Sequence, residues 1–156
     1  MRMLAFERRW AQALLEAFAP PGGAGLAPEA GEVDYVGGFE RMNDAFTARA
    51  ALGLRAALWI GALAPLWMWG RPSRVTTMPL ERRTRLVAEI CEHRIFLVRE
   101  LAFLLKTAAS FALLGTPSVR ARSNYDRGVT PVWEHGPEPK PRLPLIRDAQ
   151  ARSEVA

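Results

Sequence analysis

A stretch of helical periodicity from Thr76 to Asp126 constrains the fold of this chain more than any other part of its sequence. Thr76 or Thr77 is predicted to cap a helix, and Pro79 and Glu81 are typical of a first helical turn. Apolar residues then recur every three or four positions, as expected for one buried helical face. These residues are Leu86, Ile90, Leu97, Leu101, Leu104, Leu105, Ala108, Phe111 and Ala112.

Gly115 and Pro117 end this pattern. We expect Gly115 to take the left-handed conformation of a helix C-cap, and Pro117 to prevent the helix from continuing. An unbroken helix from Pro79 to Leu114 would be about 54 Å long, which exceeds the width of a small domain. The sequence therefore predicts either a break near Cys91–Arg94 or one continuous helix along which the others pack.

Three earlier segments also carry apolar residues at helical spacing, and none alternates as a strand does. They are residues 3–18, 32–46 and 47–69, with a Pro/Gly-rich linker at 19–31. We therefore predict an all-α fold of four to five helices in an irregular bundle. The predicted core consists of Trp10, Leu14, Phe18, Leu58, Ile60, Ile90, Leu97, Leu101, Leu104 and Phe111.

The most apolar segment is residues 47–69, which Thr47 can cap. Its uncharged run from Ala56 to Trp69 has 14 residues, fewer than the roughly 20 that span a bilayer. A buried helix is thus favoured over a transmembrane one, with Pro65 kinking or ending it. Trp67 and Trp69 either fill the interior or face a partner or membrane interface, where tryptophan is enriched. The sequence leaves both alternatives open.

The composition changes after Asp126, which divides the chain into a helical domain, 1–126, and a Pro-rich arm, 127–156. Proline-rich segments form neither helix nor central strand and adopt extended conformations. We predict that the arm binds along a partner protein, with Trp133 as its main anchor. Tyr125 would fix the root of the arm, and Arg142 would pair with acidic groups of the partner.

No set of residues in the sequence predicts catalysis. Cys91 is the only cysteine, which excludes an internal disulfide and a cysteine-based metal site. Glu89 and His93 have the spacing of helical metal ligands, but two ligands are too few for a metal site. No nucleotide-binding fingerprint is present. We therefore expect no catalytic residues, no metal and no cofactor in this chain.

The net charge of +5 comes almost wholly from arginine. No basic run with interleaved aromatic residues occurs, so nucleic acid is not expected as a partner. Arg8-Arg9 is followed by apolar residues, as in twin-arginine export signals, but Glu16 and Pro20 interrupt the apolar segment. We expect a cytoplasmic chain, or one exported together with a partner that carries the signal.

Four short motifs in the stretch from Thr76 to Asp126 resemble a known family. They are Leu80-Glu81-Arg82-Arg83, Leu104-Leu105-Lys106, Leu113-Leu114-Gly115-Thr116-Pro117 and Asn124-Tyr125-Asp126. The family comprises small helical subunits, similar to subunit 3 of gluconate 2-dehydrogenase, that accompany flavin-dependent oxidoreductases of the glucose-methanol-choline type. The helical segment ahead of the flavin domain in long-chain alcohol oxidases is also similar.

This resemblance implies a non-catalytic accessory subunit. Such a chain binds a large flavin-dependent subunit, which carries FAD, and supports its folding, maturation or positioning. The alternative is a stand-alone amphipathic helical protein that associates peripherally with anionic membranes. That alternative is based on the arginine-rich helices and on the cluster from Trp67 to Trp69.

Overall fold

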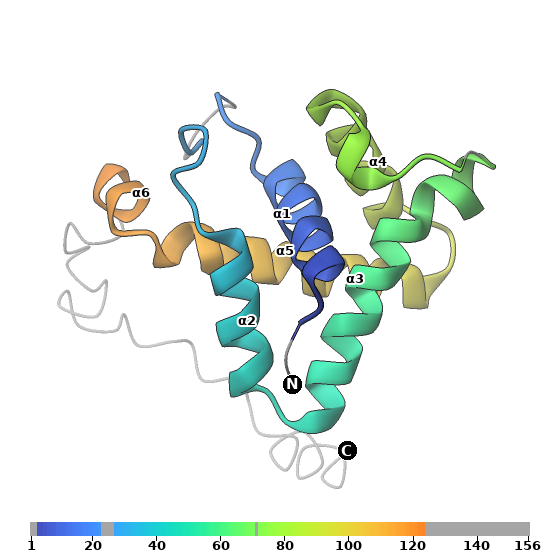
Figure 1. The fold of residues 1–156 in the computed structure, drawn as a ribbon, viewed down its shortest axis with the longest axis horizontal. Coiled ribbons are helices and arrows are strands. Elements are labelled where there is room, and N and C mark those ends of the chain that lie inside the picture. The colour runs from blue at the N-terminus through green and yellow to red at the C-terminus, as the bar shows by residue number, and fades with distance from the viewer. Residues whose placement is uncertain (1–2, 23–26, 71, 124–156) are drawn as a thin grey trace, which may run out of the picture. The chain divides into compact units, whose positions relative to one another are not determined.

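The structure, a computed structural model, describes residues 3–22, 27–70 and 72–123. Within these ranges the chain is all-α, as predicted, and contains no β-strand (Figure 1). The predicted arm, with Trp133 and Arg142, and Tyr125 at its root all lie outside the described residues. The elements are α1 (Ala5–Phe18), α2 (Tyr35–Ala45), α3 (Ala48–Trp69), η1 (Val75–Thr77, a 3₁₀ turn), α4 (Leu80–Cys91), α5 (Phe96–Gly115) and α6 (Pro117–Arg122).

Helix α5 is the helix against which the others pack. It contacts α1, α2, α3, α4 and α6, and Figure 1 shows it crossing behind α1 and α3. Its buried side is made mostly of alanines, which let neighbouring helices approach closely. Leu105 is the one large fully buried side chain that the described part of α5 adds to the shared core. The others come from the surrounding elements and include Leu14, Leu15, Phe39, Leu54, Leu58 and Leu86.

The long periodic stretch is broken into α4 and α5, so the predicted break near Cys91–Arg94 is confirmed and the continuous helix is wrong. Polar groups hold the turn between the two helices. The backbone N–H of Ile95 donates to Nδ1 of His93 at 3.2 Å, and Arg99 donates to the carbonyl of His93 at 2.9 Å. Because these bonds satisfy groups left free by the helix ends, the chain can change direction there.

The predicted cap of α4 is wrong. Thr76 and Thr77 belong to η1, where the Thr77 hydroxyl donates to the carbonyl of Arg74 at 3.0 Å. Pro79 is itself the N-cap residue, with no side-chain hydrogen bond to the helix. A local 3₁₀ turn therefore uses the threonines that the sequence assigned to the helix start.

The end of α5 also differs from the prediction. Gly115 remains helical, and Thr116 follows in an extended conformation with φ −84° and ψ 116°. The reason is Pro117, because a residue that precedes proline is disfavoured in the helical region. Pro117 then opens α6, which the sequence analysis missed. The left-handed glycine C-cap belongs to α3 instead, at Gly70.

Helix α3 begins at the predicted cap, where the Thr47 hydroxyl accepts from the N–H of Ala50 at 3.5 Å. Pro65 does not end the helix, which continues to Trp69. Among the described residues, α3 is the one helix long and apolar enough to cross a membrane by length and composition. Core helices of soluble proteins meet the same criterion, and 44% of its apolar window is buried inside the fold.

A buried carboxylate joins α1 to α3. Glu7 is fully buried and accepts two hydrogen bonds of 2.7 Å from the guanidinium of Arg55. It also accepts from Trp59 Nε1 and from the backbone N–H of Leu4, both at 2.8 Å. Burial alone would raise the pKa of Glu7, but these hydrogen bonds outweigh it and lower the pKa. The charged form is therefore the one this fold stabilises.

Candidate partner-binding surface

Helix α5 buries its small residues and exposes its large ones. The side of α5 that faces the core carries Ala102, Leu105, Ala108, Ala109 and Ala112. The opposite side carries three phenylalanines with most of their side-chain surface in solvent: Phe96 (66% exposed), Phe103 (63%) and Phe111 (63%). We call these three residues the aromatic face of α5. A helix that packs only within its own domain normally shows the reverse distribution.

Two predicted core residues belong to the exposed part of α5. Leu97 and Phe111 are each 63% exposed, so their assignment to the core is wrong. Leu14, Leu58 and Ile90 are buried as predicted. Ile60 is half-buried, and Trp10, Phe18, Leu101 and Leu104 pack against the core from partly buried positions. The physical reason for the error is that α5 is apolar on nearly all sides, so its sequence does not reveal which side is covered.

Close helix packing explains why the aromatic residues lie outside. A Cβ built on Gly38 of α2 would lie 2.6 Å from the Cβ of Ala112 in α5. At Gly61 of α3, a Cβ would lie 3.1 Å from Leu105. No room for a phenylalanine exists at such contacts, because protein interiors are close-packed.

The aromatic face is hollowed as well as apolar. A small hollow of about 200 Å³ is lined by Phe103, Lys106, Thr107, Ser110, Phe111 and Leu114. The hydroxyls of Thr107 and Ser110 donate to carbonyls within α5, at 2.8 and 3.0 Å. Both polar groups are therefore satisfied within the helix, so an apolar partner side chain can cover them at little cost.

Phe111 also forms part of a second, larger hollow. This cavity of about 490 Å³ lies between α2 and α5 and is lined by Gly38, Arg41, Met42, Phe111 and Gly115. Phe111 thus lines both hollows. Pockets beside an exposed aromatic side chain are typical of the places where partner residues anchor.

The two predicted tryptophans are separated in the structure. Trp69 is partly buried against the core, and its indole N–H donates to Glu89 at 2.8 Å. Trp67 is 41% exposed, its N–H donates to the carbonyl of Ile60 at 3.2 Å, and its ring meets His93 edge-on. Trp67 therefore remains the more accessible of the two for a partner. Their role in binding remains a prediction.

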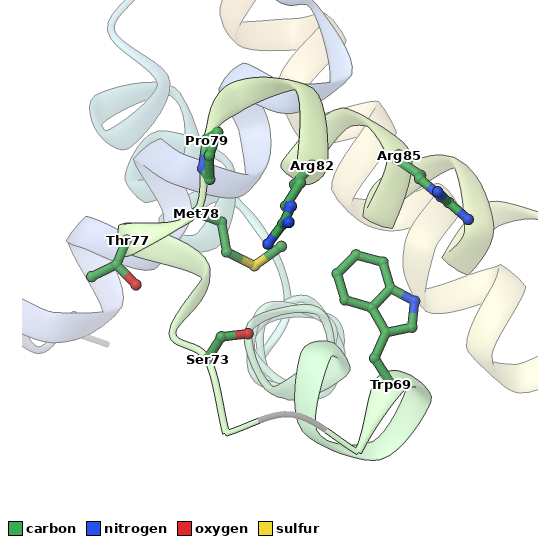
Figure 2. A pocket seen from close by; sticks show the side chains of 7 residues that line it. All are labelled: Trp69, Ser73, Thr77, Met78, Pro79, Arg82 and Arg85. Carbon is green, nitrogen blue, oxygen red and sulfur yellow. The ribbon is translucent and has the colours of Figure 1, made fainter.

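A cavity of about 510 Å³ lies beside Trp69. Figure 2 shows two side chains that reach toward the Trp69 ring: Met78, just before α4, and Arg82, near its start. Arg85 lies farther along the helix. Arg82 makes no hydrogen bond or ion pair within the described part of the chain, whereas Arg85 pairs with Glu89 at 2.7 Å. The bonds from Arg85 and Trp69 lower the pKa of Glu89. Among the described residues that line this cavity, Arg82 is thus the arginine left open to an acidic partner group.

The described residues contain no cluster of three or more His, Cys, Asp or Glu that could hold a metal ion. The candidate ligand pair is also engaged elsewhere, since Glu89 accepts from Trp69 and Arg85, and His93 accepts from Ile95. Cys91 is half-buried, and burial raises the pKa of its thiol. A raised pKa disfavours the nucleophilic thiolate.

Phe96 and Phe103 are the surface residues that sequence reasoning missed. A signal for them exists in the sequence, because α5 places alanines at 102, 108, 109 and 112 and phenylalanines at 96, 103 and 111. A helix with small residues on one side and large residues on the other is expected to pack closely through its small side. The side with the large residues is then left open.

Comparison with known proteins adds no relative. The chain matches no protein-family model, and no characterised protein or solved structure matches it significantly.

Proposed function

We propose that this chain is a non-catalytic helical subunit that docks on a larger protein through the aromatic face of α5. The observation that carries the proposal is the exposure of Phe96, Phe103 and Phe111 on one side of a helix whose other side is the core of the fold. Contiguous exposed apolar surface marks interaction sites, and aromatic residues are enriched at protein interfaces. Ile95 and Leu97, also exposed, extend this surface toward the start of α5.

The partner we propose is a flavin-dependent oxidoreductase of the glucose-methanol-choline type. The support is the resemblance of the four motifs between Leu80 and Asp126 to the small subunits of such enzymes. A flavoprotein of this type carries FAD and its own catalytic residues. This chain would then contribute contacts that help the large subunit to fold, retain FAD or reach its position, and would bind no cofactor itself.

Residues 127–146 form the second part of the proposed contact. Trp133 would anchor this arm, Tyr125 would fix its root, and Arg142 would pair with acidic groups of the large subunit. On the helical domain, Trp67 and the open guanidinium of Arg82 beside Trp69 are further candidates for the same partner.

The test is co-expression with a large flavoprotein of this type encoded beside the gene for this chain. We expect a stable complex whose absorption spectrum shows one flavin per large subunit, and a colourless small chain when it is expressed alone. A truncation after Asp126 and a Trp133→Ala variant should weaken the complex. If the two chains do not associate, the flavoprotein assignment fails. If both variants bind as the full chain does, the arm is not an anchor.

Association with anionic membranes is a second candidate, favoured by α3. Its outward side exposes a row of apolar residues at helical spacing: Leu52, Trp59, Leu63, Leu66 and Trp67. Such a row beside arginines is typical of peripheral membrane proteins. Co-sedimentation with anionic but not with neutral vesicles would support this candidate. Equal recovery with both kinds of vesicle, or with neither, would contradict it.

A further inference from the structure

A cavity between α1, α3 and the segment that follows α3 combines apolar walls with two arginines. Its volume is about 460 Å³, within the range of 300–1,000 Å³ typical of small-ligand pockets. Phe6 and Trp10 of α1 and Leu63 and Leu66 of α3 supply its apolar lining, and Arg9 and Arg74 supply its charge. This cavity is separate from the aromatic face of α5.

The two guanidinium groups are available to a ligand. Neither Arg9 nor Arg74 forms an ion pair with a carboxylate anywhere in residues 3–22, 27–70 and 72–123. Other arginines nearby are paired. Arg8 in α1, Arg55 in α3 and Arg83 in α4 each form an ion pair with a glutamate. Ser73 and Thr76 add hydroxyl groups to the lining from the same segment as Arg74. This side of the cavity therefore suits an anionic group.

The apolar wall is held in place before any ligand arrives. The rings of Phe6, Trp10 and Trp59 form three edge-to-face contacts, with centroids 4.8, 5.6 and 5.2 Å apart. Trp59 is fixed in turn by its hydrogen bond to the buried Glu7. Because these rings are already ordered, binding loses little side-chain entropy.

We propose that this cavity binds a free anionic amphiphile, a single alkyl chain with a carboxylate head. The alkyl chain lies along Phe6, Trp10, Leu63 and Leu66, and the carboxylate meets Arg9 and Arg74. A peptide fits less well, because its backbone N–H and C=O groups would face apolar walls without hydrogen-bond partners. The size and concave form of the cavity favour a small molecule over a flat lipid surface.

The experiment is calorimetric titration of the full chain with decanoate below its micelle concentration, with 1-decanol as the uncharged control. We expect saturable one-to-one binding of decanoate and at least about tenfold weaker binding of decanol, because the alcohol cannot use the charge-assisted hydrogen bonds. Decanoate should also change the tryptophan fluorescence, and Trp10→Phe should reduce that change. Equal affinities for decanoate and decanol would overturn the proposal.

Variants locate the site. Arg9→Gln combined with Arg74→Gln should weaken decanoate binding about tenfold. Arg49→Gln, an exposed arginine of α3 that does not line the cavity, should leave it unchanged. If the double variant binds decanoate normally, the proposal is wrong. If the wild-type chain binds anionic phospholipid vesicles through these arginines but no monomeric decanoate, the surface is a membrane contact and the proposal fails. None of these measurements needs the flavoprotein partner, so failure here leaves the proposed docking function untouched.

Discussion

Gly38 of α2 lies so close to Ala112 of α5 that a Cβ at position 38 would meet the alanine Cβ at 2.6 Å and its Cα at 3.1 Å. The neighbour includes backbone, which cannot move away as a flexible side chain can. This contact fixes how near α2 comes to the helix that presents the aromatic face. The glycine is therefore a packing requirement of the fold rather than a flexible joint.

We predict that Gly38→Ala lowers the free energy of unfolding by about 1 kcal/mol or more. The reason is that the overpacking against Ala112 destabilises the fold by more than the higher helix propensity of alanine stabilises it. The control is Gly53→Ala in α3, where a Cβ would meet nothing within 4 Å. This variant should raise the free energy of unfolding by up to about 1 kcal/mol. Urea unfolding of both proteins measures the difference. Similar effects at the two positions would refute the close contact.

The Glu7–Arg55 pair gives a second prediction. Glu7→Gln leaves the guanidinium of Arg55 without its charged partner in a site where the carboxylate is fully buried. We expect a loss of about 3 kcal/mol in the free energy of unfolding, the size seen when one partner of a buried pair is removed. Arg55→Met should cost a similar amount, and the double variant less than the sum. Additive losses would show that the two side chains do not interact.

The carboxylate of Glu32 ties the segment before α2 to α6. It accepts two hydrogen bonds from Arg122, at 2.8 and 2.6 Å, and one from Ser118. The bonds from Arg122, then that from Ser118, then the backbone N–H of Glu29 lower the pKa of Glu32 to about 2. Because the folded pKa lies below the ordinary value of 4.5, its contribution to stability is complete above pH 4.5.

We therefore predict that Glu32→Gln is less stable than the wild type at pH 6. The difference should shrink as the pH falls from 4.5 toward 2, because in that interval the carboxyl of Glu32 takes up a proton in the unfolded chain while it stays ionised in the folded one. Thermal unfolding of both proteins across this range provides the measurement. A difference that stays constant from pH 6 to pH 2 would mean that the ionised carboxylate does not hold α6.

Local sequence signals predicted the helices and the break at Cys91–Arg94 because each depends on neighbouring residues. Thr47 as the cap of α3 is such a case. The start of α4 and the end of α5 were misassigned because a 3₁₀ turn and a helix-starting proline used the same residues differently. Thr77 could have capped α4 but belongs to a 3₁₀ turn, and Gly115 could have capped α5 but is its last helical residue. The contacts in the folded chain decide between these alternatives.

The candidate surface was harder to predict. Periodicity identifies an apolar helix, but in α5 it does not separate the covered side from the open one, so Phe111 was placed in the core. The buried role of Glu7 was equally hidden, since its partners Arg55 and Trp59 are 48 and 52 positions away. A charged residue beside Arg8 and Arg9 has no local feature that indicates burial.

In the proposed function, a partner protein binds to the aromatic face of α5. The most direct measurement is the affinity with which the purified large flavoprotein subunit binds two variants of this chain. The variants are Phe103→Ser and a matched control, Leu52→Ser. Leu52 of α3 is 62% exposed and Phe103 is 63% exposed, so neither change should unfold the chain. We predict that Phe103→Ser weakens binding by at least about 30-fold, the effect of losing an interface hot spot of about 2 kcal/mol. Leu52→Ser should bind as the wild type does. Unchanged affinity of Phe103→Ser, or equal losses for the two variants, would contradict the claim.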